Sequence, residues 1–369
     1  MSSEAIPSKV IVFELGEYNS KIGFAGQQEP LLIPTIMVDS GKPIINIQQF
    51  SLLYSINRKK YYGLDAAALL ETLYPNYILK KHNLGELLEF IKYAISFLLK
   101  DQSVNDYGLL FLHKPSLAES DKLFFKDVFL NIIGLQSIAF LPENFAIMTA
   151  LSKDTAVMID LGESASRAVS IFKNFPNLQA NQESMISSSI FSTELSKSLK
   201  YRTEIIEEEI FIPLLSEIKK NAFFVSQSPD KDYETCKADP KEYLIKFNLP
   251  DGSEFTLDSE RFMIPELYFR PELKDYRANS IVELVKQSIG AWERDQVPEL
   301  LKNIILYGGG SHIPGLKERL ENEVKKQFPS SLTISITDFP NIPELSWVCG
   351  SAAVSKNLIK NWISKGGSI

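Results

Sequence analysis

The sequence has few of the residues that build disulfide frameworks and metal clusters. Its 369 residues include two cysteines, Cys236 and Cys349, and three histidines, His82, His113 and His312, which stand far apart. Two cysteines cannot form a disulfide framework, and neither belongs to a Cys-x-x-Cys pair. A reducing compartment and the absence of a zinc cluster are therefore expected.

Long apolar runs and blocks of like charge are also missing. No segment approaches the roughly 20 apolar residues that span a bilayer, and the N-terminus lacks a basic stretch followed by an apolar one. The 39 basic and 46 acidic residues give a net charge of −7 and are spread along the chain. We therefore expect a soluble intracellular protein that binds neither nucleic acid nor an anionic membrane directly.

Apolar residues are abundant enough for more than one core. They make up 44% of a chain whose length predicts two or three domains. The apolar spacing of residues 84–100 predicts an amphipathic helix, and residues 303–327 predict a strand, a glycine turn and a helix with Pro314 in its first turn. Strands that alternate with helices predict an α/β protein with mixed sheets. Three polar stretches, residues 41–61, 174–198 and 226–242, are expected to be exposed loops.

One short pattern occurs twice. Glu14-Leu-Gly-Glu and Asp160-Leu-Gly-Glu both follow an apolar run, and the alignment places Ser20-Lys21 over Ser166-Arg167. Each copy reads as two strands joined by a glycine turn. A repeat 146 residues apart indicates two related lobes.

Glycine turns of this kind can bind phosphate, because their backbone N–H groups form a concave array. Two such turns could grip the phosphates of a nucleotide, while a third turn, Gly308-Gly309-Gly310, could lie against a base or ribose. The alternative is that Gly16 and Gly162 serve turn geometry alone.

Several motifs of the chain resemble the actin superfamily. They are "KIGFAG" (Lys21 to Gly26), "MIDLGES" (Met158 to Ser164), "NIILYGGGSHIPG" (Asn303 to Gly315), "LSWVCGSA" (Leu345 to Ala352) and "NWISK" (Asn361 to Lys365). The resemblance implies an actin-like, ribonuclease-H-like fold with a nucleotide cleft between duplicated domains. It places the first lobe at residues 1–152, with a small shortened subdomain at about 40–80. The second lobe follows at residues 153–345, with an inserted subdomain at about 178–260, and residues 346–369 return to the first.

The resemblance also implies a site for ATP or ADP with magnesium. The metal would have no direct protein ligand, and Glu14 and Asp160 would reach it through water. The implied nucleotide-binding residues are Glu14, Gly16, Glu17, Ser20, Lys21, Asp160, Gly162, Glu163, Ser166, Lys219, Lys220, Gly308, Gly309 and Gly310.

Several positions of this implied site depart from the family pattern. Glu14 replaces an aspartate near the metal's waters, and Glu163 and Ser164 replace an aspartate and a glycine in the second hairpin. Glu17 stands where the family has a small hydroxyl residue at the terminal phosphate, and Glu143 replaces the glutamine that orients the attacking water. Lys219-Lys220 replaces a lysine-glutamate pair near the ribose. A carboxylate about 4 Å from a phosphate charge costs up to about 4 kcal/mol at an effective dielectric of about 20. We therefore expect a degenerate site and no enzyme, with a nucleotide held as a structural ligand. An empty cleft and an active ATPase are the alternatives.

Within the superfamily, the opening "VIVFELGEYNSKIGFAGQQEP" and the short stretch of residues 41–80 resemble the pointed-end actin-related proteins of dynactin. This implies a cytoplasmic, cytoskeletal subunit that caps an actin-related filament and supports dynein-dependent transport along microtubules. Residues 261–271 and 345–352 would contact the filament subunit on the barbed side. Lys59, Lys60, Tyr61 and Tyr62 would face other pointed-end subunits. The alternatives are a nuclear actin-related protein of a chromatin-remodelling complex and a phosphotransferase on the same fold.

Overall fold

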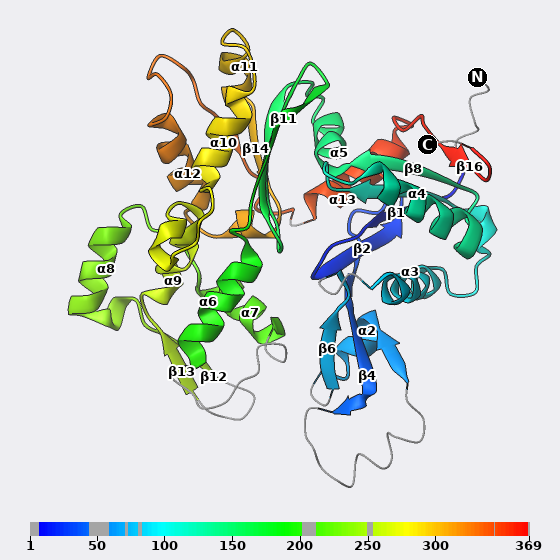
Figure 1. Ribbon diagram of the computed structural model, residues 1–369, viewed down its shortest axis with the longest axis horizontal. Coiled ribbons are helices and arrows are strands. Elements are labelled where there is room, and N and C mark those ends of the chain that lie inside the picture. The colour runs from blue at the N-terminus through cyan, green and yellow to red at the C-terminus, as the bar shows by residue number, and fades with distance from the viewer. Residues whose placement is uncertain are drawn as a thin grey trace. The chain divides into compact units, whose positions relative to one another are not determined.

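The chain forms two compact units, each with its own sheet and core. The computed structural model describes residues 7–43, 59–70, 73–79, 83–200, 212–248, 254–342 and 344–367. Unit 1 comprises Met1–Lys153 and Glu344–Ile369, and unit 2 comprises Asp154–Pro343. Figure 1 shows that strands and helices build both units, as the alternating sequence pattern predicted.

Unit 1 contains a six-stranded sheet in the order β16-β8-β7-β1-β2-β3. Its strands are β1 (Val10–Glu14), β2 (Asn19–Phe24), β3 (Leu31–Pro34), β7 (Gly108–His113), β8 (Ser137–Pro142) and β16 (Ile363–Ser364). The helical elements are α2 (Gly63–Ala67), α3 (Leu84–Leu99), η2 (Val104–Asp106), α4 (Glu119–Asp127), η3 (Val128–Ile133), α5 (Glu143–Ala150) and α13 (Leu345–Ser355). The amphipathic helix predicted at residues 84–100 is thus confirmed as α3.

Strand β1 is buried along its whole length because both faces of this sheet are covered. Ile11 and Phe13 point into a core shared with α3, α4 and η3. Val12 points the other way, and its carbonyl accepts a hydrogen bond from the indole Nε1 of Trp347 on α13 at 3.0 Å. The result is a fully buried strand that ends at Glu14.

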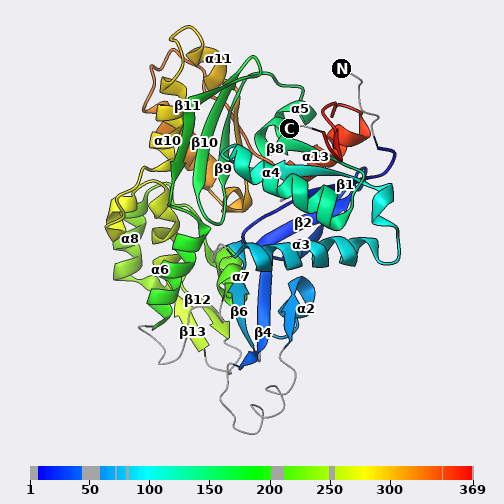
Figure 2. The ribbon, with the colours of Figure 1, turned by 45° about the vertical axis from the view of Figure 1, so that its right-hand side comes forward.

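A small antiparallel sheet extends from unit 1. Its order is β5-β4-β6, with β4 (Ile36–Pro43), β5 (Lys60–Tyr62) and β6 (Leu73–Tyr77). Figures 1 and 2 both show it together with α2, beyond α3 and away from the six-stranded sheet. Residues 44–58 lie outside the described part of the chain, so the predicted loop at residues 41–61 is described only at its ends, in β4 and β5.

Unit 2 is built on a five-stranded sheet in the order β11-β10-β9-β14-β15. The strands are β9 (Ala156–Leu161), β10 (Ser166–Phe172), β11 (Phe175–Ser184), β14 (Ile304–Tyr307) and β15 (Ile336–Thr337), and β12 (Ile245–Asn248) pairs with β13 (Glu254–Leu257). The helical elements are α6 (Ser188–Lys200), α7 (Ile212–Ala222), α8 (Pro229–Ala238), η4 (Pro240–Glu242), α9 (Glu260–Met263), η5 (Pro265–Tyr268), η6 (Pro271–Lys274), α10 (Ile281–Gly290), α11 (Val297–Leu301), η7 (Gly309–His312) and α12 (Leu316–Lys325). Helix α10 packs on β10 and β11.

Two of the predicted exposed loops are wrong. Residues 174–198 form β11 and most of α6, because Ile186, Phe191 and Leu195 enter the core of unit 2 between polar residues. The many serines and glutamines of this stretch obscured that apolar spacing.

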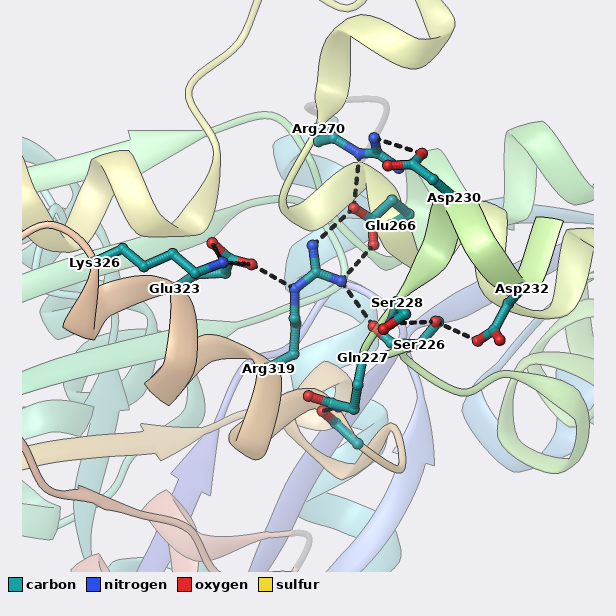
Figure 3. Close-up of polar contacts among 11 residues, drawn as sticks. Ser226, Gln227, Ser228, Asp230, Asp232, Glu266, Arg270, Arg319, Glu323 and Lys326 are labelled. Carbon is teal, nitrogen blue, oxygen red and sulfur yellow. Dashed lines mark hydrogen bonds and ion pairs between the residues drawn. The ribbon is translucent and has the colours of Figure 1, made fainter. Parts of the chain in front are cut away.

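Residues 226–242 were also predicted as a loop, and they contain helix α8. Figure 3 shows the polar contacts that anchor its start. The guanidinium of Arg319 donates to the Ser226 carbonyl at 2.7 Å and contacts both carboxylate oxygens of the buried Glu266. Arg270 bridges Glu266 and Asp230 at 2.8 and 2.9 Å. Distant residues therefore fix a stretch whose own composition is typical of a loop.

The segment 303–327 follows its prediction except at the helix start. β14, the glycine turn and α12 are all present, but α12 begins at Leu316, after the N-cap Gly315 with φ of 81°. Pro314 lies before the cap, and its carbonyl accepts the backbone N–H of Val225 at 2.8 Å.

The two segments expected to contact a filament neighbour are largely interior. Phe262, Leu267 and Tyr268 of residues 261–271 are fully buried, as is Trp347 of residues 345–352. Their apolar side chains complete the cores of units 2 and 1, and the docking of these two segments onto a neighbour stays a prediction.

Candidate functional site

The first glycine hairpin joins β1 to β2 and brings two predicted site residues together. Glu14 stands opposite Lys21 in the antiparallel ladder, and the Lys21 ammonium forms an ion pair with Glu14 Oε1. Glu14 Oε2 accepts a hydrogen bond from the Ser346 hydroxyl on α13. The carboxylate is only 4% exposed, so its charge is balanced inside unit 1.

The turn of this hairpin is held by Thr35, a residue that the sequence reasoning missed. Its Oγ1 donates to the Gly16 carbonyl at 2.6 Å, and its backbone N–H donates to the Tyr18 carbonyl at 2.9 Å. The hydroxyls of Thr35 and Ser20 lie 2.8 Å apart, and both residues are fully buried. Ser20 therefore braces the turn from inside. Thr35 follows β3 without any glycine or charge beside it that would have marked it.

The tip of the same turn contains Gly16 and Glu17. A Cβ on Gly16 would lie 2.2 Å from the Asn19 carbonyl oxygen, which requires glycine. Glu17 is half-buried, and its side chain makes no hydrogen bond or ion pair with the described residues. Its negative charge is thus available to repel an anion at the turn.

The second hairpin, between β9 and β10, repeats the same plan in unit 2. Asp160 stands opposite Arg167, with Oδ2 3.4 Å from Nη1, and Arg167 also bonds Glu183 at 2.8 Å. The Ser166 hydroxyl is buried and donates to the Ile186 carbonyl at 2.6 Å. The carbonyls of Gly162 and Glu163 accept the amides of Ser188 and Ser189, at the start of α6, at 3.2 and 2.9 Å.

Of the two lysines on α7, one reaches this hairpin. The Lys219 ammonium donates to Ser188 Oγ at 2.6 Å and to Ser192 Oγ at 2.7 Å, and it lies 3.9 Å from Glu163 Oε2. Lys220 is exposed on another side of the helix. The structure therefore associates Lys219, and not Lys220, with the second hairpin.

The third glycine turn packs against the end of β9. Gly308 has φ of 91°, and a Cβ there would lie 2.7 Å from Asp160 Oδ1 and from the Leu161 carbonyl oxygen. A Cβ on Gly310 would lie 2.3 Å from Tyr268 Oη, whereas one on Gly309 would meet nothing within 4 Å. Packing thus requires glycine at 308 and 310, and Gly309 leaves an open surface that a flat ligand can approach.

Glu143, at the position expected to orient water, is paired. It is the first residue of α5 and is 2% exposed, and its Oε2 lies 2.7 Å from the Lys114 ammonium. The neighbouring His113 is buried, which lowers its pKa to about 4. Lys114 therefore offsets the negative charge of Glu143.

The two units can each be tested for groups that suit a phosphate-bearing ligand. Unit 2 offers Gly309, Lys219 and the turn of Gly162, and it also holds a buried tyrosine hydroxyl without a partner, at Tyr268. Unit 1 offers Lys21 and the turn of Gly16. No group of three or more His, Cys, Asp or Glu residues that could hold a metal occurs in the described ranges. Each unit by itself thus offers donors that suit phosphate oxygens.

Comparison with known families identifies the fold. The family model for actin matches residues 6–212 and 207–367, which together span nearly the whole chain. This match, with the mixed sheets and helices of both units, confirms the predicted actin-like fold. Within the described residues, no helix has the length and apolar character needed to cross a membrane. The chain belongs to the actin family.

Proposed function

We propose that this protein is a non-catalytic actin-related structural subunit that caps the pointed end of the dynactin actin-related filament. Actin-family proteins generally bind ATP or ADP with magnesium and are typically cytoskeletal. In this role the protein supports dynein-dependent transport along microtubules, and a nucleotide serves as a structural ligand. The proposal rests on the family membership, on the sequence resemblance to the dynactin subgroup and on three structural observations.

The observation that carries the non-catalytic part is that two buried carboxylates of unit 1, those of Glu143 and Glu14, are already bonded. Glu143 is paired with Lys114, and Glu14 is paired with Lys21 and hydrogen-bonded to Ser346. A general base must be within hydrogen-bond reach of the proton that it accepts and free to accept it. Carboxylates that are committed to lysines are poor candidates for orienting or activating water.

Each unit by itself offers groups that suit a nucleotide. In unit 2, the turn amides of the second hairpin suit phosphate oxygens, and the open face of Gly309 suits a flat base. In unit 1, the turn amides of the first hairpin also suit phosphate oxygens, whereas the Lys21 ammonium is held by Glu14. Bound magnesium would screen the phosphate charges. Glu17 opposes this binding by charge repulsion, so the affinity is expected to be modest.

The capping part draws on an exposed basic and aromatic groove in unit 1. The groove has a volume of about 360 Å³ and is lined by Lys59, Lys60, Tyr61, Tyr62 and Tyr93, with Asp65, Ala68 and Leu69. Lys59 lies over the Tyr61 ring at 5.2 Å, and Glu86 binds both Lys60 and the Tyr62 hydroxyl. Tyrosine is enriched at protein interfaces, because it combines an apolar ring with a polar group. This groove supports a protein partner at the small subdomain.

Unit 2 has an apolar surface that supports docking onto a neighbouring filament subunit. Phe175 and Leu178 of β11 are 73% and 86% exposed. The strand around them is fixed, since the Asn177 side chain donates to the Ala291 carbonyl at 3.0 Å. We take these two exposed side chains as the candidate docking surface of unit 2. A subunit with one docking face and a second face of different chemistry ends filament growth.

Phosphate release by the purified protein tests the catalytic part. We expect no turnover with ATP and magnesium, while filament-forming actin measured in parallel releases phosphate. Turnover comparable with that of actin would contradict the proposal.

Electron microscopy of the isolated assembly tests the capping part. We expect one copy at the pointed end, and no filaments from the pure protein. The double substitution Phe175→Ser and Leu178→Ser should release the subunit from the filament, whereas Leu273→Ser, at a 41% exposed apolar side chain elsewhere on unit 2, is the control. Copies inside the filament, or purification with a chromatin-remodelling complex, would overturn the proposal.

A further inference from the structure

The hydroxyl of Tyr268 has no hydrogen-bond partner among the residues that the structure describes. Tyr268 is the last residue of η5 and is fully buried. A buried polar group without a partner costs stability, and most buried hydroxyls in native proteins avoid this. The position of this hydroxyl therefore needs an explanation.

The surroundings of the hydroxyl are the parts of unit 2 that form the candidate site. Its oxygen lies against Gly310, where an added Cβ would be 2.3 Å away, and Leu161 of β9 borders the same space. The ring of Tyr268 meets Phe191 edge-on, with 4.6 Å between the ring centroids. Burial and the nearby carboxylates of Glu163 and Asp160 raise the pKa of Tyr268, so the hydroxyl stays protonated and is a hydrogen-bond donor.

The glycine turn and the hydroxyl are in direct contact, because Gly310 has no side chain to separate them. The turn itself rests on β9 at Gly308, through contacts that only glycine allows. A small outward movement of the turn would open the space above the hydroxyl to a water molecule or to a peptide oxygen of the turn. Such a movement would remove the cost of the unpaired hydroxyl.

We propose that Tyr268 is a positioning residue of the nucleotide site, whose hydroxyl gains a hydrogen-bond partner when a nucleotide draws the Gly308–Gly310 turn outward. This inference rests on the nucleotide-binding part of the proposed function. The unpaired hydroxyl raises the free energy of the nucleotide-free state, and binding relieves that cost. Tyr268 thus favours the occupied state without touching the ligand.

The test compares Tyr268→Phe with Tyr276→Phe in the full chain. The Tyr276 hydroxyl donates to Glu194 at 2.7 Å, so it is a matched tyrosine that already has a partner. Without nucleotide, Tyr268→Phe should raise the unfolding temperature and Tyr276→Phe should lower it. By calorimetry with magnesium and ATP or ADP, Tyr268→Phe should weaken binding roughly tenfold, and Tyr276→Phe should leave it unchanged.

Each other outcome overturns the inference. A lower unfolding temperature for Tyr268→Phe would mean that the hydroxyl has a partner in the free protein. A higher temperature with unchanged affinity would mean that the hydroxyl is a packing defect without a link to the ligand. Absence of nucleotide binding by the wild-type protein would also end the inference, while the capping role, which is measured by the position in the filament, would stand or fall separately.

Discussion

The two glycine hairpins share one plan but are stabilised by different means. Each has a carboxylate opposite a cation across the strands, a glycine turn and a buried serine after it. In the first hairpin, a side chain, Thr35, holds the glycine carbonyl. In the second, the backbone amide of Ser188, at the start of α6, does so. The first hairpin should therefore be sensitive to single substitutions, and the second should tolerate them.

The largest expected difference between the two hairpins is in the free energy of unfolding that each loses when its cross-strand ion pair is removed. Lys21→Met leaves Glu14 buried with the Ser346 hydroxyl and no cation, and removal of one partner of a buried pair costs about 3 kcal/mol. Arg167→Met removes a longer contact to the buried Asp160, at 3.4 Å, and a bond to the largely exposed Glu183, so we expect a smaller loss of about 1.5 kcal/mol. Urea denaturation of both variants measures the difference.

An equal loss of unfolding free energy in the two variants would contradict this difference, because it would show that the second hairpin depends on its ion pair as much as the first. Glu14→Gln together with Lys21→Met is the matched control. Removing both charges should recover most of the stability that Lys21→Met loses.

Removal of the Thr35 hydroxyl is expected to have an effect of intermediate size on stability. Thr35→Val keeps the shape but removes the donor to the Gly16 carbonyl and the partner of Ser20, and buried groups left unpaired cost about 2 kcal/mol. Thr35→Ser retains the hydroxyl and should cost less than half as much. In unit 2, Ser166→Ala removes one hydrogen bond to Ile186 and should cost about 1 kcal/mol. Thermal unfolding measures the loss of stability in both variants. If Thr35→Val loses no more stability than Ser166→Ala, the Thr35 hydroxyl is not what holds the first turn.

The sequence predicts those features that depend on contacts between residues close together in the chain. Both hairpins, helix α3 and the segment from β14 to α12 were predictable, because glycine turns and apolar spacing are local signals. The pairing of Glu143 with Lys114 was not, since 29 positions separate them and nothing in either neighbourhood marks the contact. Thr35, Ser346 and Tyr268 were missed for the same reason. Local pattern thus predicts which elements form, and tertiary contacts decide which charges of the candidate site are balanced.

The strands beside the two hairpins differ in how they respond to pH, which gives the smallest effect. β7 runs parallel to β1 and ends in His113, whereas β14 runs parallel to β9 and ends in Tyr307. Burial lowers the pKa of His113 to about 4, so the folded protein keeps it neutral while the unfolded chain takes up a proton below about pH 6.5. The contribution of neutral His113 to the free energy of unfolding is therefore complete above about pH 6.5. It decreases as the pH falls toward 4, and about 1 kcal/mol is lost at pH 5.5. The difference in unfolding free energy between the wild type and His113→Gln, measured at pH 7.5 and at pH 5.5, isolates this contribution. A difference that stays constant between the two pH values would show that His113 titrates normally and that the end of β7 is open to water.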